Sequence, residues 1–276
     1  MNNKTTHRTS DARPVSRALL VIAGIAVLTV LSTPTQAQYH PPMHVGVRCQ
    51  TDFQYNWNPT LVIPYALCSA FIDTIRATDY NDFYFNLHGA ETTFYYGLPS
   101  ARETCSICGG TDSVDFFFLA THGGIASTDP TVAGFAMWDY KANALTPYMR
   151  FGARLKIFAT YSCDTLKTSD GRFWSRWGPA YRGGLKISLG AHNLLYDDNP
   201  QQGSEFATRM QNGEPVGLVW LEAVWNGDHR NAPSVANTGV NAGDCWNRQG
   251  ANLAGVTAMP ALRDGQIGYV CYSERN

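Results

Sequence analysis

The chain has 276 residues, of which 44% are hydrophobic and 12% aromatic, while only 16% are charged. This composition supplies a hydrophobic core and excludes a disordered or fibrous chain. The formal net charge of -1 gives no sign of a nucleic-acid-binding protein, whose binding face would be basic. The length predicts one or two domains.

Residues 1–37 have the pattern of a secretory signal peptide. Basic residues precede an apolar run from Ala18 to Leu31, and a small-x-small pattern ends at Ala37. The alternative is a membrane anchor, but the run is shorter than the roughly 20 residues that a spanning helix needs. We therefore expect cleavage after Ala37, export to the periplasm or the extracellular space, and no stable membrane span after cleavage.

The mature part, residues 38–276, is expected to be a single domain with irregular, disulfide-bearing extensions at both ends. It holds all seven cysteines, at positions 49, 68, 105, 108, 163, 245 and 271. An oxidising compartment favours pairing, and an odd count leaves at least one thiol. We expect Cys163 to be that thiol and the other six to pair, with a connectivity that the sequence leaves open.

Cys105 and Cys108 have a spacing that also occurs in metal and redox sites. No second pair with zinc-like spacing follows, so a disulfide role is the better interpretation in an exported protein. We expect no metal and no cofactor.

The region before residue 114 contains few clear elements. Residues 38–64 are expected to be irregular, with one strand near Val45. Phe71, Ile72 and Ile75 have helical spacing and predict a helix over residues 65–78. A strand and turn are expected within 79–98, and a loop over 101–113.

Three short apolar runs then predict buried parallel strands, over residues 114–121, 155–161 and 185–191. Helices are expected between and after them, over residues 173–181, 205–212 and 215–225. The alternation predicts an α/β fold with a mainly parallel sheet flanked by helices.

Two of these runs are followed by residues that can carry nucleophilic chemistry. His122 comes directly after the first run, and Cys163 after the second. If the strands are parallel neighbours, both residues lie at the same edge of the sheet, where ligands bind in such folds. A base beside a thiol is what a nucleophilic site requires, so we expect the pair to share a solvent-reachable cleft.

Other residues compete for or extend this site. His88, before Gly89, is a rival base, but it lies far from Cys163 along the chain. His192 follows the third run and would either line the pocket or simply pack. Asp197 and Asp198 would either select a basic substrate side chain or lie in an exposed turn.

Three segments resemble the caspase-like cysteine peptidases, which include caspases, gingipains, legumains, separases and bacterial CHAT domains. They are FFFLATHGG around His122, KIFATYSCDT around Cys163, and GSEFATRMQNGEPVGLVWLEAV from Gly203 to Val224. The likeness is closest to CHAT-like and gingipain-like domains and implies a caspase-like sandwich. The nearest relatives are expected in a bacterial family with a domain of unknown function.

The resemblance implies an exported cysteine endopeptidase that acts on a peptide or protein substrate. Cys163 would be the nucleophile and His122 the general acid-base. The backbone N–H groups of Gly123 and Cys163 would form the oxyanion hole, and Asp164 would shape the pocket.

Two non-enzymatic alternatives remain open at the level of the sequence. The first is a binding protein on the same fold, whose site has decayed or been repurposed. The second is a structural protein in which Cys163 is bridged. The oligomeric state cannot be read from the sequence.

Overall fold

The computed structural model describes residues 43–49, 61, 63–78, 83–87, 114–136, 144–149, 151, 154–196 and 199–276. All of them lie in one compact unit, Tyr39–Asn276. Several predictions lie outside the described residues: the signal peptide, the loop over 101–113 with Cys105 and Cys108, the rival pair His88-Gly89, and Asp197 with Asp198.

The centre of this unit is a seven-stranded sheet with the order β10-β9-β8-β7-β3-β1-β2. Strands β1, β2, β3, β7 and β8 are joined by parallel pairings, whereas β9 runs antiparallel to β8 and to β10. The predicted mainly parallel sheet is therefore confirmed. The strands are β1 (Met43–Cys49), β2 (Phe83–Leu87), β3 (Phe116–Ala120), β7 (Ile157–Tyr161), β8 (Ile187–Ala191), β9 (Pro233–Gly239) and β10 (Tyr269–Glu274).

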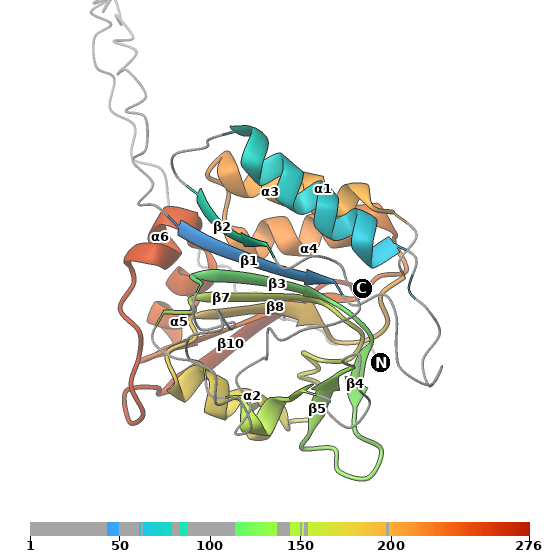
Figure 1. The fold of residues 1–276 in the computed structure, drawn as a ribbon. Helices are drawn as coiled ribbons and strands as arrows, with labels where there is room; N and C mark the ends of the chain where they lie inside the picture. The colour runs from blue at the N-terminus through green and yellow to red at the C-terminus, as the bar shows by residue number, and fades with distance from the viewer. Residues whose placement is uncertain are drawn as a thin grey trace, which may run out of the picture. The chain divides into compact units, whose positions relative to one another are not determined.

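Helices cover both faces of this sheet (Figure 1). Helices α1 (Ile63–Thr78), α3 (Gln201–Gln211) and α4 (Val216–Gly227) pack on one face, and α2 (Phe173–Arg182) lies on the other. The central strands supply both cores because successive side chains point to opposite faces. Phe116 and Phe118 pack against α1, α3 and α4, while Phe117 and Leu119 belong to the core beneath α2. The flanking helices predicted from the sequence are confirmed.

Some helix boundaries differ from those predicted. Helix α1 begins at Ile63, with Pro64 in its first turn, where a missing N–H costs nothing. Helix α3 begins at Gln201 and so contains Gly203. A Cβ atom on Gly203 would collide with the carbonyl oxygen of Leu67, so the glycine allows α1 and α3 to approach closely.

A second, three-stranded antiparallel sheet follows β3, and the sequence did not predict it. Its strands are β4 (Gly123–Ile125), β5 (Ala133–Phe135) and β6 (Ala144–Leu145), with the 3-10 helix η4 (Thr146–Tyr148) directly after them. The Thr146 hydroxyl donates a hydrogen bond to the Ala133 carbonyl at 3.1 Å. Gly123, the first residue of β4, directly follows His122, so this sheet fixes the backbone after the histidine.

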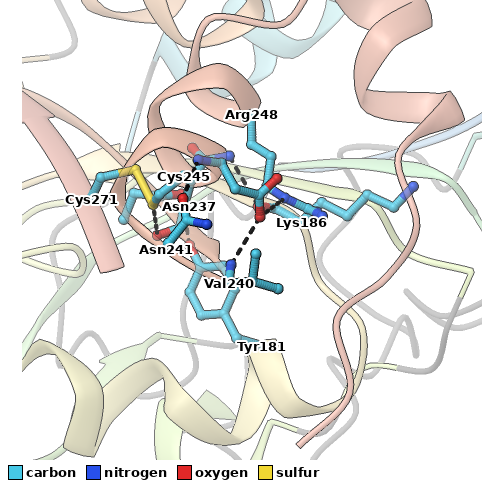
Figure 2. The surroundings of a disulfide bond; sticks show 10 residues. Tyr181, Lys186, Asn237, Val240, Asn241, Cys245, Arg248 and Cys271 are labelled. Atoms are coloured by element: carbon cyan, nitrogen blue, oxygen red, sulfur yellow. Dashed lines mark hydrogen bonds and ion pairs between the residues drawn. A yellow bond between two sulfur atoms is a disulfide. The ribbon is translucent and has the colours of Figure 1, made fainter. Parts of the chain in front are cut away.

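The region after α4 also contains elements that were not predicted. Helices α5 (Ala242–Gln249) and α6 (Leu253–Ala258) connect β9 to β10, and a Cys245–Cys271 disulfide ties α5 to β10 (Figure 2). The Lys186 ammonium group donates to the Val256 carbonyl at 2.9 Å and to the Thr257 carbonyl at 3.2 Å, at the end of α6. Burial lowers the pKa of Lys186 to about 8.

The described cysteines divide as predicted. Cys49 of β1 is bonded to Cys68 of α1, with their Cα atoms 6.4 Å apart. Cys245 is bonded to Cys271, with their Cα atoms 5.9 Å apart. Cys163 remains a thiol outside both bridges. Disulfides of this kind persist in oxidising compartments. Within the described ranges, no helix has both the length and the apolar character needed to cross a membrane.

Candidate functional site

The topology brings His122 and Cys163 to the same edge of the sheet. Strands β3 and β7 are parallel neighbours in which Ala120 is paired with Tyr161, and the Thr121 N–H extends this pairing to the Tyr161 carbonyl at 3.3 Å. His122 and Cys163 each lie two residues beyond these paired positions, and both are half-buried. Figure 1 shows the two strands side by side. The predicted juxtaposition of the two strand ends is therefore present, while their catalytic roles remain a prediction.

The backbone after His122 packs tightly against the segment that carries Cys163. A Cβ atom on Gly123 would lie 2.5 Å from Thr165 Cγ2, 2.8 Å from Ser162 Cβ and 3.0 Å from the Cys163 carbonyl oxygen. These distances leave no room for a side chain. Only glycine at position 123 therefore allows the backbone after His122 to pack this closely against residues 162–165.

The hydrogen-bond pattern of the β4–β5 ladder sets the direction of the Gly123 N–H. The Ala136 N–H donates to the His122 carbonyl at 2.9 Å, on the outer side of the Gly123–Phe135 pair. This pattern makes Gly123–Phe135 a non-hydrogen-bonded pair, whose N–H and C=O groups point away from the partner strand. The Gly123 N–H is therefore not used by β5.

The Cys163 thiol contacts the loop that follows β8. The Leu195 N–H donates to Cys163 Sγ at 3.3 Å, and Sγ lies 3.7 Å from the Leu195 carbonyl oxygen, to which the thiol donates. The segment after the cysteine is fixed from the other side. The Thr165 hydroxyl donates to the Ser162 carbonyl at 3.1 Å, and the Trp177 indole donates to the Thr165 carbonyl at 2.7 Å.

Asp164, predicted to shape the pocket, has an unusual backbone. Among the non-glycine residues that the structure describes, Asp164 is the one with a positive φ, at 54°. Aspartate tolerates this left-handed conformation better than most residues, and such outliers gather at functional sites. The Asp164 N–H donates to the Asn193 carbonyl at 3.0 Å, and its carboxylate lies 3.8 Å from the Lys167 ammonium group. The turn at Asp164 is thus held by the loop after β8 and by Lys167, three residues further along the chain.

His192 lies at the same sheet edge but is engaged by the last residue of the sequence. Its Nε2 atom is 2.7 Å from Asn276 Oδ1, and its backbone N–H donates to the Ala232 carbonyl at 3.0 Å. Nearby, the Thr168 hydroxyl donates to the Glu274 carboxylate. The last residue of β10 therefore contacts the segment that follows β7, and Asn276, beyond β10, contacts the loop that follows β8. This arrangement places His192 next to the predicted site without giving it a chemical role.

Arg176 is a residue that sequence reasoning missed. Its buried guanidinium group donates to the Pro130 carbonyl at 2.7 Å and to both Asp170 oxygens at 2.7 and 2.8 Å, and also to the Lys167 carbonyl. It therefore links the turn between β4 and β5 to the segment after Cys163. These hydrogen bonds hold the pKa of Asp170 at about 2. An isolated arginine in an aromatic helix carries no sequence signal for such a link.

The family comparison covers this arrangement except for Glu274 and Asn276. The family model described as "Domain of unknown function (DUF6345)" matches residues 74–254. The chain belongs to this family. The DUF6345 match includes His122, Cys163 and the β8 loop, and it ends within α6. No curated protein matches the chain. Within the described part of this DUF6345 member, no three His, Cys, Asp or Glu side chains gather as a metal site would require.

Proposed function

We propose that this DUF6345 member is an exported cysteine endopeptidase of caspase-like architecture, with Cys163 and His122 as its catalytic pair. The observation that carries the proposal is the register of β3 and β7, which brings a histidine and a thiol to equivalent positions at one sheet edge. Cys163 keeps its thiol while the other four described cysteines are bonded. A thiol retained in a disulfide-forming protein is the pattern expected of a nucleophile.

The mechanism assigns each group one task. His122 takes the proton of the Cys163 thiol, and the resulting thiolate attacks the carbonyl carbon of the scissile peptide bond and forms a tetrahedral intermediate. Its oxyanion is held by the Gly123 N–H, which the β4–β5 ladder does not use, and by the Cys163 N–H. His122 protonates the leaving amine as the C–N bond breaks, which leaves an acyl-enzyme. It then takes a proton from water, whose oxygen attacks the acyl group and releases the thiolate.

A second candidate function follows from the surroundings of the sulfur. Cys163 Sγ accepts a hydrogen bond from the Leu195 N–H and donates one to the Leu195 carbonyl, as a merely packed thiol would. On this basis the alternative is a non-catalytic binding or structural protein on the same fold. It would retain the geometry of the strand ends but hydrolyse no peptide.

Digestion of a protein-derived peptide mixture, read by mass spectrometry, separates the two functions. The peptidase proposal predicts new peptide ends with the wild type, none with Cys163→Ala, and a rate reduced by about 10²–10⁴-fold with His122→Ala. His88→Ala serves as the matched histidine control and should cleave like the wild type. Cleavage that survives Cys163→Ala would refute the proposal, and a loss with His88→Ala but not with His122→Ala would assign the base to the rival.

A further inference from the structure

The loop from Asn193 to Tyr196 is the structural partner of Cys163. Besides the two contacts between Leu195 and the sulfur, at 3.3 Å from the N–H and 3.7 Å from the carbonyl, the loop accepts the Asp164 N–H through Asn193. Cys163 and Asp164 are therefore both hydrogen-bonded to this loop, the first through its sulfur and the second through its backbone N–H. Whatever fixes the loop also fixes the environment of the thiol.

Buried side chains fasten this loop at Tyr196, directly after Leu195. The Tyr196 N–H donates to Asn231 Oδ1 at 2.6 Å, and the Tyr161 hydroxyl donates to the Tyr196 carbonyl. On the other side of Leu195, the Ala232 N–H donates to the Leu194 carbonyl at 3.2 Å. The Ala232 hydrogen bond holds the peptide group that carries the Leu195 N–H, and the Asn231 hydrogen bond holds the peptide group that carries the Leu195 carbonyl, so Leu195 is fixed on both sides.

The two fastening side chains are also bonded to each other. The Asn231 amide donates to the Val224 carbonyl at 2.9 Å and to the Tyr161 hydroxyl at 3.3 Å. Asn231 is 1% exposed and Tyr161 is 5% exposed. A buried amide whose oxygen and nitrogen are both engaged has one orientation, so the network is rigid. It joins the last residue of β7, two positions before Cys163, to the loop beyond β8.

We propose that Asn231 and Tyr161 are positioning residues that fasten the loop at Tyr196, hold Leu195 against the Cys163 sulfur with its N–H as the nearer group, and so favour the thiolate over the thiol. An N–H donor stabilises a charged acceptor more strongly than a neutral one. The Leu195 carbonyl would favour the neutral thiol, but it is the more distant of the two groups. The consequence for catalysis rests on the proposed function, because the thiolate is the attacking species.

The experiment is the pH dependence of Cys163 alkylation by iodoacetamide in the full chain. Tyr161→Phe removes only the hydroxyl, and Asn231→Ala removes the amide as a second variant. Tyr181→Phe is the matched control, since it deletes another buried hydroxyl that donates to a backbone carbonyl, that of Ala236 at 2.7 Å, in the core beneath α2. We expect the alkylation midpoint to rise by about one pH unit in Tyr161→Phe and Asn231→Ala, and to stay unchanged in Tyr181→Phe.

Thermal unfolding of the same samples separates positioning from general destabilisation. Both tyrosine variants should lose stability, but only Tyr161→Phe should move the midpoint. Equal midpoints in wild type and Tyr161→Phe, or equal movement in Tyr161→Phe and Tyr181→Phe, would overturn the inference. A midpoint shift in a protein that cleaves no peptide would support the positioning network and refute the peptidase proposal, so the two failures are distinguishable.

Discussion

Substitution of Gly123 by alanine tests the close approach of the His122 and Cys163 segments. The added Cβ atom would lie 2.5 Å from Thr165 Cγ2 and 2.8 Å from Ser162 Cβ. Both neighbours are buried, since Thr165 is 0% exposed and Ser162 is 2% exposed, so neither can move into solvent. Overpacking of this kind costs about 1–3 kcal/mol. We therefore expect Gly123→Ala to lower the free energy of unfolding by about 2 kcal/mol.

The adjacent glycine provides the matched control. A Cβ atom on Gly124 would meet no atom within 4 Å. Alanine there should be neutral or stabilise by about 0.4–1 kcal/mol, because it restricts the unfolded chain where the native backbone accepts it. The two single substitutions thus have opposite predicted signs, although they differ by one position in the same strand, β4.

A double substitution identifies the colliding atom. Thr165→Ser removes Cγ2 but keeps the hydroxyl that donates to the Ser162 carbonyl. Gly123→Ala combined with Thr165→Ser should recover part of the stability that Gly123→Ala alone loses. Urea denaturation provides the free energies, and their non-additivity measures the contact. Equal stabilities for Gly123→Ala and Gly124→Ala would show that the two segments are not packed as described.

Three further predictions concern an ion pair near the site, a disulfide and signal cleavage. Because Arg176 lowers the pKa of Asp170 to about 2, this pair stabilises the fold above pH 3.8 and loses its effect as the pH falls through 2. Asp170→Asn should therefore cost about 2 kcal/mol at neutral pH and flatten the acid unfolding profile, and an unchanged profile would contradict the pairing. Replacement of both Cys245 and Cys271 by serine should lower the free energy of unfolding by about 3 kcal/mol, measured in urea; no loss would exclude a stabilising bridge. Intact-mass analysis of exported protein should give Gln38 as the first residue, whereas a retained Met1 would refute signal cleavage.

The sequence predicted those parts of the fold that are held by apolar burial. Strands β3 and β7 are continuous apolar runs because each contributes side chains to both cores, and β8 contributes Ile187 and Leu189 to the core beneath α1, α3 and α4. The parallel order of β3 and β7 was predicted from a crossover long enough to join parallel neighbours, and that order placed His122 and Cys163 at one edge. The candidate pair could thus be predicted because it depends on topology alone.

The remainder depends on polar contacts that leave no periodic pattern. Strand β9 is buried throughout, yet it contains Ser234 and Asn237, which donate to the Leu166 and Lys186 carbonyls. The sequence of β9, PSVANTG, has the composition of a loop and does not predict a buried strand. The proposed positioning role of Asn231 and the thiol contact of Leu195 likewise arise from hydrogen bonds between side chains and backbone groups that are far apart along the chain. No spacing of residue types encodes the direction of a backbone N–H.

The most direct test of the central claim is the rate of Cys163 alkylation at pH 6 in wild type and in His122→Ala. If the two residues form a catalytic pair, the histidine stabilises the thiolate at this pH, and its removal should slow alkylation by about tenfold. Above pH 9, where an ordinary thiol is already ionised, the two rates should converge. Identical rates at pH 6 would contradict the account, because they would show that the ionisation of Cys163 does not depend on His122.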